Sequence, residues 1–153
     1  MSILDEVQTG MNPGPVKMNI GGTDGIGKTT FAAGAPKPIF IKTEEGTRYV
    51  NTSSFPLCES FEDIMHRLKQ LVQEEHDFKT VVLDTTDWAE KLIQEEVARQ
   101  KNVSSIEDIG YGKGYTMTAE GFQKILRALD VLNDQKNMNV ILLSHVAIRT
   151  FAD

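Results

Sequence analysis

Four residues near the start of the chain have the types and spacing that bind phosphate. Gly22, Gly27, Lys28 and Thr29 match the pattern G-x-x-x-x-G-K-[ST]. Glycines let the backbone wrap closely around a phosphate group, successive N–H groups face its negative charge, and the lysine reaches the β and γ phosphates. The threonine hydroxyl is a ligand for Mg²⁺. The pattern therefore predicts a P-loop for ATP and Mg²⁺, formed by Gly22, Thr23, Asp24, Gly25, Ile26, Gly27, Lys28, Thr29 and Thr30.

A carboxylate ends an apolar segment further along the chain. Residues 80–84 read Thr-Val-Val-Leu-Asp, and Asp84 stands where P-loop enzymes hold Mg²⁺ against the P-loop hydroxyl. A carboxylate at the end of a buried strand can instead cap the helix that follows, and this alternative stays open. Thr85, not a glutamate, follows Asp84. A catalytic carboxylate must therefore come from elsewhere in the chain or be missing.

The elements that must position these residues alternate between strand and helix. Short apolar runs predict strands, apolar residues at spacings of three and four predict helices, and glycines and prolines mark the turns between them. We expect strands over 16–20, 38–42, 80–84 and 139–145, and helices over 28–34, 60–72, 86–101 and the region around 122–132. The alternation predicts an α/β fold, a three-layer P-loop NTPase with a mainly parallel sheet, whose ligand lies at the carboxyl ends of the strands.

The composition is that of one globular domain. The chain has 153 residues, 40% hydrophobic and 25% charged, so we expect one P-loop domain over 16–153, preceded by a flexible tail over 1–15. The net charge of −6 lacks the basic footprint of a protein that coats duplex DNA. No apolar run or secretory signal points to a membrane, so we expect no membrane partner and a cytoplasmic location. The single cysteine, Cys58, is interpreted as a packing residue.

Several further segments follow the P-loop in a distinctive order. They are Pro36-Lys-Pro38, Thr43-Glu-Glu-Gly-Thr47, Leu83-Asp-Thr85, Gly110-Tyr-Gly-Lys-Gly-Tyr115 and a strand that ends in His145. In this order the chain resembles the RecA-like ATPases, and within them the phage nucleotide-binding proteins of the single-strand annealing class. The resemblance implies a RecA-like core in which Glu44 polarises the attacking water and His145 senses the γ-phosphate. Together with Lys28 of the P-loop, these residues form the candidate catalytic set. For a phage protein the location would be the host cytoplasm.

Two features depart from that family. Lys42 stands two residues before Glu44, where relatives commonly have an acidic or neutral residue, and a cation there could pair with Glu44 or alter its reach. The chain also ends at Asp153, whereas RecA-like cores usually continue with further strands, so we expect a core truncated at its C-terminus or a reduced protein. Glu44 could instead be a solvated turn acid beside Glu45, and His145 could simply cap the sheet by hydrogen bonding.

Glycines, tyrosines and a lysine interleave between residues 110 and 115. In a mobile loop, Tyr111 and Tyr115 could stack bases while Lys113 meets a phosphate, which would suit single-stranded DNA. Arg149 falls where RecA-like proteins have a second DNA-contacting loop. The alternative is a glycine turn whose tyrosines pack on the neighbouring helix, or a contact between subunits.

Two functional hypotheses follow from these residues. The first is an ATP-binding and ATP-hydrolysing RecA-like protein that acts on single-stranded DNA in phage recombination or replication, with a homo-oligomer as a compatible assembly. The second is a nucleotide-dependent interaction module with little or no turnover. A small-molecule kinase ranks third, because the five arginines are scattered along the chain, whereas a kinase lid needs them clustered. A GTPase would need an Asn-Lys-x-Asp segment to read guanine, which this sequence lacks.

Overall fold

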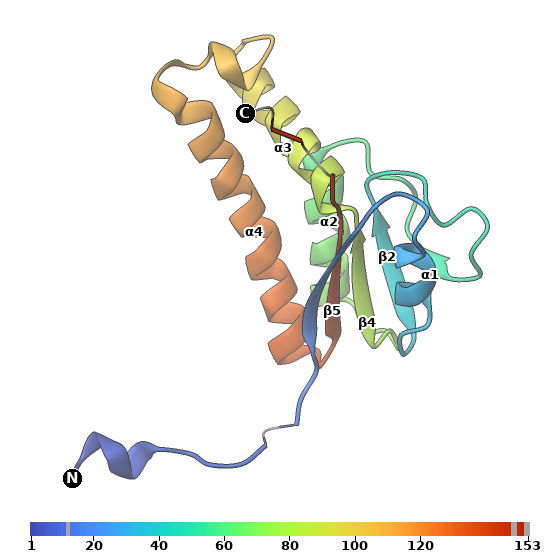
Figure 1. Cartoon of the computed structure of the whole chain (residues 1–153), viewed down its shortest axis with the longest axis vertical. Coiled ribbons are helices and arrows are strands. Elements are labelled where there is room, and N and C mark those ends of the chain that lie inside the picture. The colour runs from blue at the N-terminus through green and yellow to red at the C-terminus, as the bar shows by residue number, and fades with distance from the viewer. Residues whose placement is uncertain (12, 148–149, 152–153) are drawn as a thin grey trace.

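The chain folds as a five-stranded sheet with helices on both faces (Figure 1). The computed structural model describes residues 1–11, 13–147 and 150–151. The strands are β1 (Lys17–Gly22), β2 (Pro38–Lys42), β3 (Ser53–Ser54), β4 (Thr80–Asp84) and β5 (Asn139–His145). The helices are α1 (Lys28–Ala33), α2 (Phe61–Gln73), α3 (Thr86–Gln100) and α4 (Lys113–Gln135), with shorter 3₁₀ turns at Ile3–Glu6, Ile106–Asp108 and Gly110–Gly112.

Every pair of neighbouring strands is parallel, and the order across the sheet is β1-β5-β4-β2-β3. Gly22 pairs with His145 across β1 and β5. Asp84 pairs with Leu143 on one side and with Lys42 on the other. Because parallel strands bring their carboxyl ends to one edge of a sheet, the P-loop and the ends of β2, β4 and β5 meet at the same edge. The predicted mainly parallel α/β sheet is confirmed.

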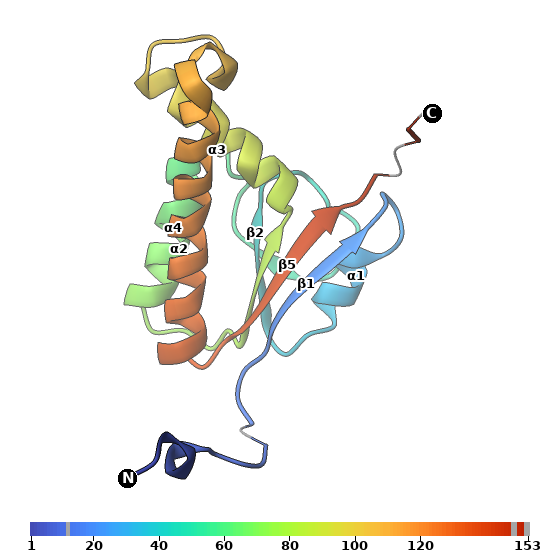
Figure 2. The ribbon, with the colours of Figure 1, turned by 60° about the vertical axis from the view of Figure 1, so that its left-hand side comes forward.

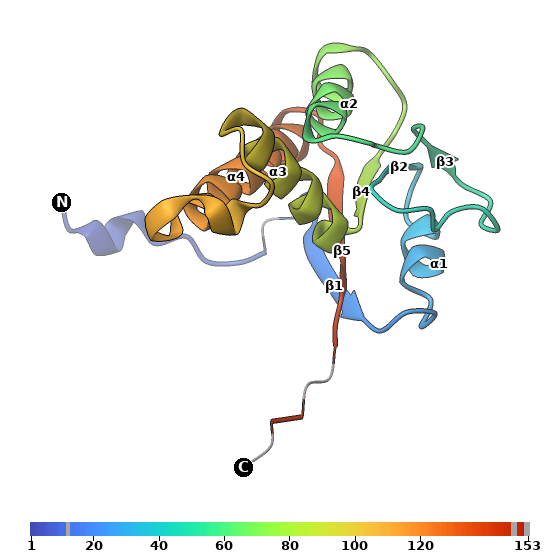
Figure 3. The same cartoon turned by 90° about the horizontal axis from the view of Figure 1, so that it is seen from above.

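Helices cover the two faces of the sheet unequally. Figure 3 shows α2, α3 and α4 on one face and α1 on the other. The larger core lies under the three helices, each of which contributes a fully buried isoleucine: Ile64, Ile93 and Ile125. The smaller core lies under α1 and contains Phe40 and Val82. Since both faces are covered, β4 is buried along its whole length, which is why its sequence reads as a continuous apolar run.

Local signals in the sequence set the ends of the helices near the site. The Ser60 side chain accepts a hydrogen bond from the Asp63 N–H and caps the start of α2. α1 begins directly after Gly27, whose φ of 102° lies in the left-handed region. It ends at Ala33, shortly before Pro36, which cannot continue a helix. The short α1 therefore follows from glycine before it and proline after it.

The start of α4 differs from the sequence-based expectation. A mobile loop over 110–115 is the wrong prediction for its second half, because Gly110–Gly112 forms a 3₁₀ turn and α4 begins at Lys113. Gly114 is buried against the preceding turn, and a Cβ on it would lie 2.4 Å from the Ile106 carbonyl oxygen. Glycine at this position lets the first turn of α4 pack directly on the turn Ile106–Asp108. Tyr111 therefore lies in the 3₁₀ turn and Tyr115 in the first turn of α4.

Residues 1–11 extend away from the sheet (Figures 1 and 2). They contain the 3₁₀ turn Ile3–Glu6, which is capped by Ser2, and all eleven are exposed. Throughout the described part of the chain, no helix combines the length and the apolar character needed to cross a membrane.

Candidate functional site

The turn between β1 and α1 has the backbone geometry of a phosphate-binding loop. Gly25 and Gly27 have φ values of 75° and 102°, a region that side chains with a Cβ rarely adopt. A Cβ on Gly22 would lie 2.7 Å from Ile26 Cγ2. These glycines let the loop close on itself and leave its inner side open to a ligand.

Lys28 is held at the centre of this loop. Its Nζ donates hydrogen bonds to the carbonyl oxygens of Gly22 at 2.8 Å and Thr23 at 3.0 Å, and the residue is 8% exposed. Burying an ammonium group is unfavourable unless it is paired. Neutral carbonyls are weaker acceptors than a phosphate anion. Lys28 is thus placed to exchange these carbonyl contacts for a phosphate.

Thr29 and Asp84 meet at the sheet edge beside the loop. The Thr29 hydroxyl donates to Asp84 Oδ2 at 2.8 Å. Gly46 packs against both side chains, since a Cβ on it would lie 3.3 Å from Asp84 Oδ2 and 3.4 Å from Thr29 Oγ1. Burial raises the pKa of the Asp84 carboxyl, and the charge of Glu44 acts in the same direction, while the Thr29 hydrogen bond opposes them.

The donor set formed by Thr29 and Asp84 fits Mg²⁺ that arrives with a nucleotide. Mg²⁺ keeps several waters and binds phosphate oxygens, so it takes few ligands from the protein. Within residues 1–11, 13–147 and 150–151, no cluster of three or more His, Cys, Asp or Glu side chains is arranged to hold a metal by itself. A cation here would also offset the unfavourable burial of the Asp84 charge.

Glu44 and His145 contact each other although 101 positions separate them in the chain. Nε2 of His145 lies 2.9 Å from Glu44 Oε1, and the Thr85 hydroxyl donates to the other carboxylate oxygen at 3.3 Å. Nδ1 of His145 lies 2.7 Å from Asp24 Oδ1 in the P-loop. The His145 backbone N–H donates to Asp87 Oδ2 at 2.7 Å. One imidazole ring therefore links the P-loop to the segment after β2.

Lys42 does not pair with Glu44. Its Nζ donates to the two carboxylate oxygens of Glu45 at 3.2 and 3.4 Å. Glu44 has a side chain only 25% exposed and bonded at both oxygens, so the alternative of a solvated turn acid describes Glu45 better than Glu44. Because Lys42 pairs with Glu45, it does not occupy the carboxylate of Glu44, the candidate catalytic acid.

The predicted residues come together in one cleft of about 290 Å³. Its lining contains Lys28 and Thr29 from the P-loop and three groups from the ends of other strands, namely Glu44, Asp84 and His145. Asp24, Gly25, Gly27, Thr30, Gly46, Val50 and Thr85 complete the wall. Gly22, Thr23 and Ile26 belong to the predicted loop but do not line the cleft.

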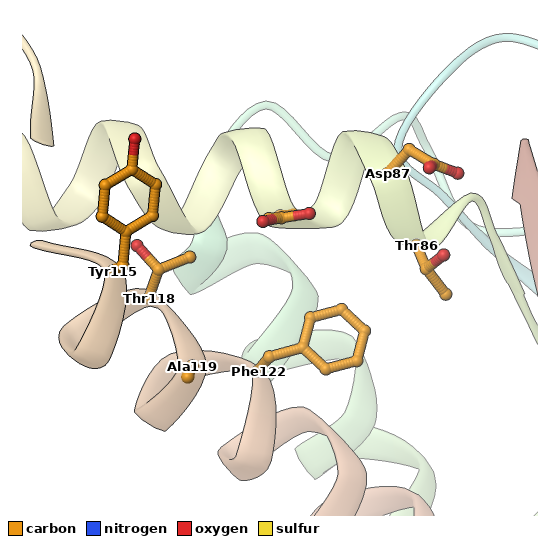
Figure 4. A pocket seen from close by; sticks show the side chains of 7 residues that line it. Thr86, Asp87, Tyr115, Thr118, Ala119 and Phe122 are labelled. Carbon is orange, nitrogen blue, oxygen red and sulfur yellow. The ribbon is translucent and has the colours of Figure 1, made fainter. Parts of the chain in front are cut away.

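A second pocket, of about 320 Å³, opens between α3 and α4 (Figure 4). Tyr115 and Phe122 line it from α4, and Asp87 and Glu90 line it from α3. In Figure 4 the Tyr115 ring points toward α3, and the Phe122 ring extends along the pocket toward the end at which Thr86 lies. Asp87 also accepts the hydrogen bond from the His145 N–H. This carboxylate therefore lies between the second pocket and the nucleotide cleft.

The structure describes three of the four residues predicted to contact DNA. Tyr111 is fully exposed, Tyr115 is 56% exposed, and Lys113 is exposed beside them at the start of α4. The alternative in which both tyrosines pack on the neighbouring helix therefore does not hold for Tyr111. Arg149 lies outside the described residues.

Several contributors to the site carry no sequence signal that singles them out. Thr43 fixes the strand end, because its N–H donates to the Asp84 carbonyl and its hydroxyl both donates to the Thr85 carbonyl and accepts from the Thr85 N–H. The Asp24 contact depends on tertiary structure. Asp87 looks in sequence like an ordinary acid in the first turn of a helix.

A parallel sheet with a glycine-rich loop after its first strand, a buried lysine in that loop and a threonine paired with a strand-end carboxylate define the class of P-loop NTPases. A family model described as AAA domain matches residues 14–153, and the chain belongs to this family. A comparison with curated proteins found no match. The chain is accordingly a nucleotide-binding domain of the P-loop class.

Proposed function

We propose that this domain binds ATP with Mg²⁺ and hydrolyses it as a RecA-like ATPase. The observation that carries the proposal is the position of Glu44, a carboxylate that lines the same cleft as Lys28 and Asp84. Because Thr85 follows Asp84, the usual neighbouring glutamate is absent, and Glu44 supplies the missing acid from the end of the adjacent strand β2.

Each side chain has a role that its contacts support. Lys28 binds the phosphates, and Thr29 and Asp84 hold Mg²⁺, which neutralises charge on the phosphate oxygens. The Glu44 carboxylate orients a water and accepts its proton as the water attacks the terminal phosphate. His145 holds one Glu44 oxygen and Thr85 the other, so the carboxylate has a defined direction before a water arrives.

We also propose single-stranded DNA as the partner, with phage recombination or replication as the setting. The fully exposed Tyr111 supports base stacking, and the resemblance of the segment order supports the setting. The pocket between α3 and α4 offers Tyr115 and Phe122 as apolar walls and two carboxylates as acceptors for base amino groups. Those carboxylates would repel phosphates, so a base rather than the DNA backbone fits there.

One observation favours the alternative, a nucleotide-dependent interaction module with little turnover. Both oxygens of Glu44 already have partners, at 2.9 and 3.3 Å. If these contacts persist with nucleotide bound, the carboxylate has less capacity to take up a proton.

The test is ATP turnover by the purified protein, with and without single-stranded DNA, for the wild type and the Glu44→Gln variant. The amide keeps the size of the side chain but cannot act as a base, so turnover should fall by about 10²–10⁴-fold while ATP affinity holds. Glu45→Gln is the matched control, because Glu45 pairs with Lys42 outside this chemistry. A wild type that binds ATP without turnover would favour the interaction module. Loss of turnover in Glu45→Gln alone would mean that Glu45, and not Glu44, is the catalytic acid.

A further inference from the structure

His145 has a carboxylate at each of its ring nitrogens. Nε2 lies 2.9 Å from Glu44, the candidate catalytic acid, and Nδ1 lies 2.7 Å from Asp24. Asp24 is the only acidic residue in the loop 22–30, and its side chain is 89% exposed. A loop built to bind phosphate thus carries an anion of its own, which contacts a histidine at the end of β5, the strand that neighbours β1.

The position of Asp24 suits a group that a phosphate displaces. Asp24, Lys28 and His145 line the same cleft, so an anionic ligand on Lys28 brings negative charge close to the Asp24 carboxylate and repels it. The Asp24 side chain lies almost wholly in solvent, so water competes for its contact with His145, and the contact contributes little to stability. The contact between Asp24 and His145 is therefore cheap to break, and the ring nitrogen it releases can donate to a phosphate oxygen.

We infer that Asp24 is a positioning residue that takes the place of the terminal phosphate when no nucleotide is bound, holding the His145 ring so that its other nitrogen stays on Glu44. The inference rests on the proposed nucleotide site. ATP displaces Asp24 and takes over His145 Nδ1. ADP, which lacks the terminal phosphate, leaves the pair intact, so the pair discriminates between the two nucleotides.

The experiment measures dissociation constants for a non-hydrolysable ATP analogue and for ADP, both with Mg²⁺. The proteins are the wild type, Asp24→Asn, His145→Gln and the double variant. Removing the Asp24 charge should tighten the binding of both nucleotides, and the analogue should gain about two- to fivefold more than ADP, because only the analogue must displace Asp24 from His145. In the His145→Gln background this additional gain should vanish. Glu45→Gln, an acid near the cleft that does not contact His145, should leave the analogue-to-ADP ratio unchanged.

Two results would overturn the inference while leaving the nucleotide site intact. Equal gains for the analogue and ADP in Asp24→Asn would mean that the carboxylate acts by charge alone. A preferential gain that persists in the double variant would mean that His145 is not its target. A wild type that binds neither nucleotide would refute the proposed function itself.

An independent measurement reports the pair without any nucleotide. Imidazole ¹⁵N spectra contain signals from the three histidines of the chain, and His145→Gln identifies those of His145. Asp24→Asn should shift the Nδ1 resonance of His145 more than the Nε2 resonance, and adding the ATP analogue to the wild type should shift Nδ1 in turn. An Nδ1 resonance that does not respond to Asp24→Asn would show that the pair is not formed in solution.

Discussion

The nucleotide cleft and the region at the start of α4, residues 110–115, place their candidate functional side chains by different means. In the cleft, polar groups from the start of α1 and from the ends of β2, β4 and β5 bond to one another, as in the pairs Thr29–Asp84 and Glu44–His145. At the start of α4, Tyr111 projects fully into solvent. A parallel sheet fixes the relative positions of its strand ends, so the cleft is preorganised, whereas no comparable framework surrounds the exposed Tyr111 ring.

The comparison predicts its largest effect at Lys28. Lys28→Ala removes a cation that accounts for two hydrogen bonds within the loop and, in the proposal, for charge-assisted bonds to phosphate. Each such bond contributes about 1.5–3 kcal/mol, so affinity for ATP should fall by about 100-fold or more. Calorimetric titration measures the affinity, and circular dichroism should show that the fold survives.

Lys124→Ala is the matched control for this variant, since Lys124 is an exposed lysine on α4. It should leave ATP affinity unchanged. If Lys28→Ala and Lys124→Ala bind ATP equally well, the assignment of the loop as the phosphate site fails.

The second prediction concerns the exposed tyrosines at the start of α4, Tyr111 and Tyr115. Tyr111→Ala should weaken binding of single-stranded DNA by about 1–3 kcal/mol through the loss of one stacking ring, and leave ATP affinity nearly intact. Tyr115→Ala should have a similar effect on DNA but should also perturb the pocket between α3 and α4, which its ring lines. Fluorescence anisotropy with a labelled oligonucleotide at low salt measures both.

Tyr49 supplies the control, because it is 92% exposed on a segment outside the start of α4. Tyr49→Ala should bind DNA as the wild type does. Equal losses in all three variants would indicate nonspecific adhesion to aromatic surface. A wild type that does not bind DNA at low salt would leave the start of α4 without this role.

The sequence predicts the cleft better than it predicts the start of α4. The P-loop and Asp84 lie at the ends of elements with strong local signals, namely glycines, a buried apolar run and prolines after α1. Such signals depend on neighbouring residues in the sequence, so they predict these elements without knowledge of the tertiary structure. The boundary of α4 depends on Gly114 packing on Ile106, a contact between segments that no local pattern encodes. For the same reason, the partners of Lys42 and Asp24 become visible only when the strand ends are assembled.

The last prediction has the smallest expected effect and concerns Asp84. It tests whether the buried Asp84 carboxylate contributes to metal binding or to the stability of the fold. Asp84 is 2% exposed and its pKa is raised, chiefly by burial, so folding disfavours its charged form. Asp84→Asn keeps an oxygen that can accept from Thr29 but removes the buried charge. In nucleotide-free protein with a chelator at neutral pH, the free energy of unfolding should therefore rise by about 1 kcal/mol, while the Mg²⁺ dependence of ATP binding weakens.

The pH dependence of this gain follows from the direction of the pKa shift. A carboxyl whose pKa is raised in the folded state binds its proton more tightly there than in the unfolded chain, so wild-type stability falls as pH rises above the ordinary value of 3.8. The advantage of Asp84→Asn should thus be full at neutral pH and shrink as pH falls toward 4, where the wild type becomes protonated.

Asp63 gives a control of opposite sign. Its pKa is lowered, mainly by the hydrogen bond from the Glu59 N–H, so Asp63→Asn should destabilise the protein. Urea denaturation at neutral pH measures both variants. If both are less stable than the wild type, the Asp84 carboxylate stabilises the fold, and it is not a residue that lowers stability in order to bind metal.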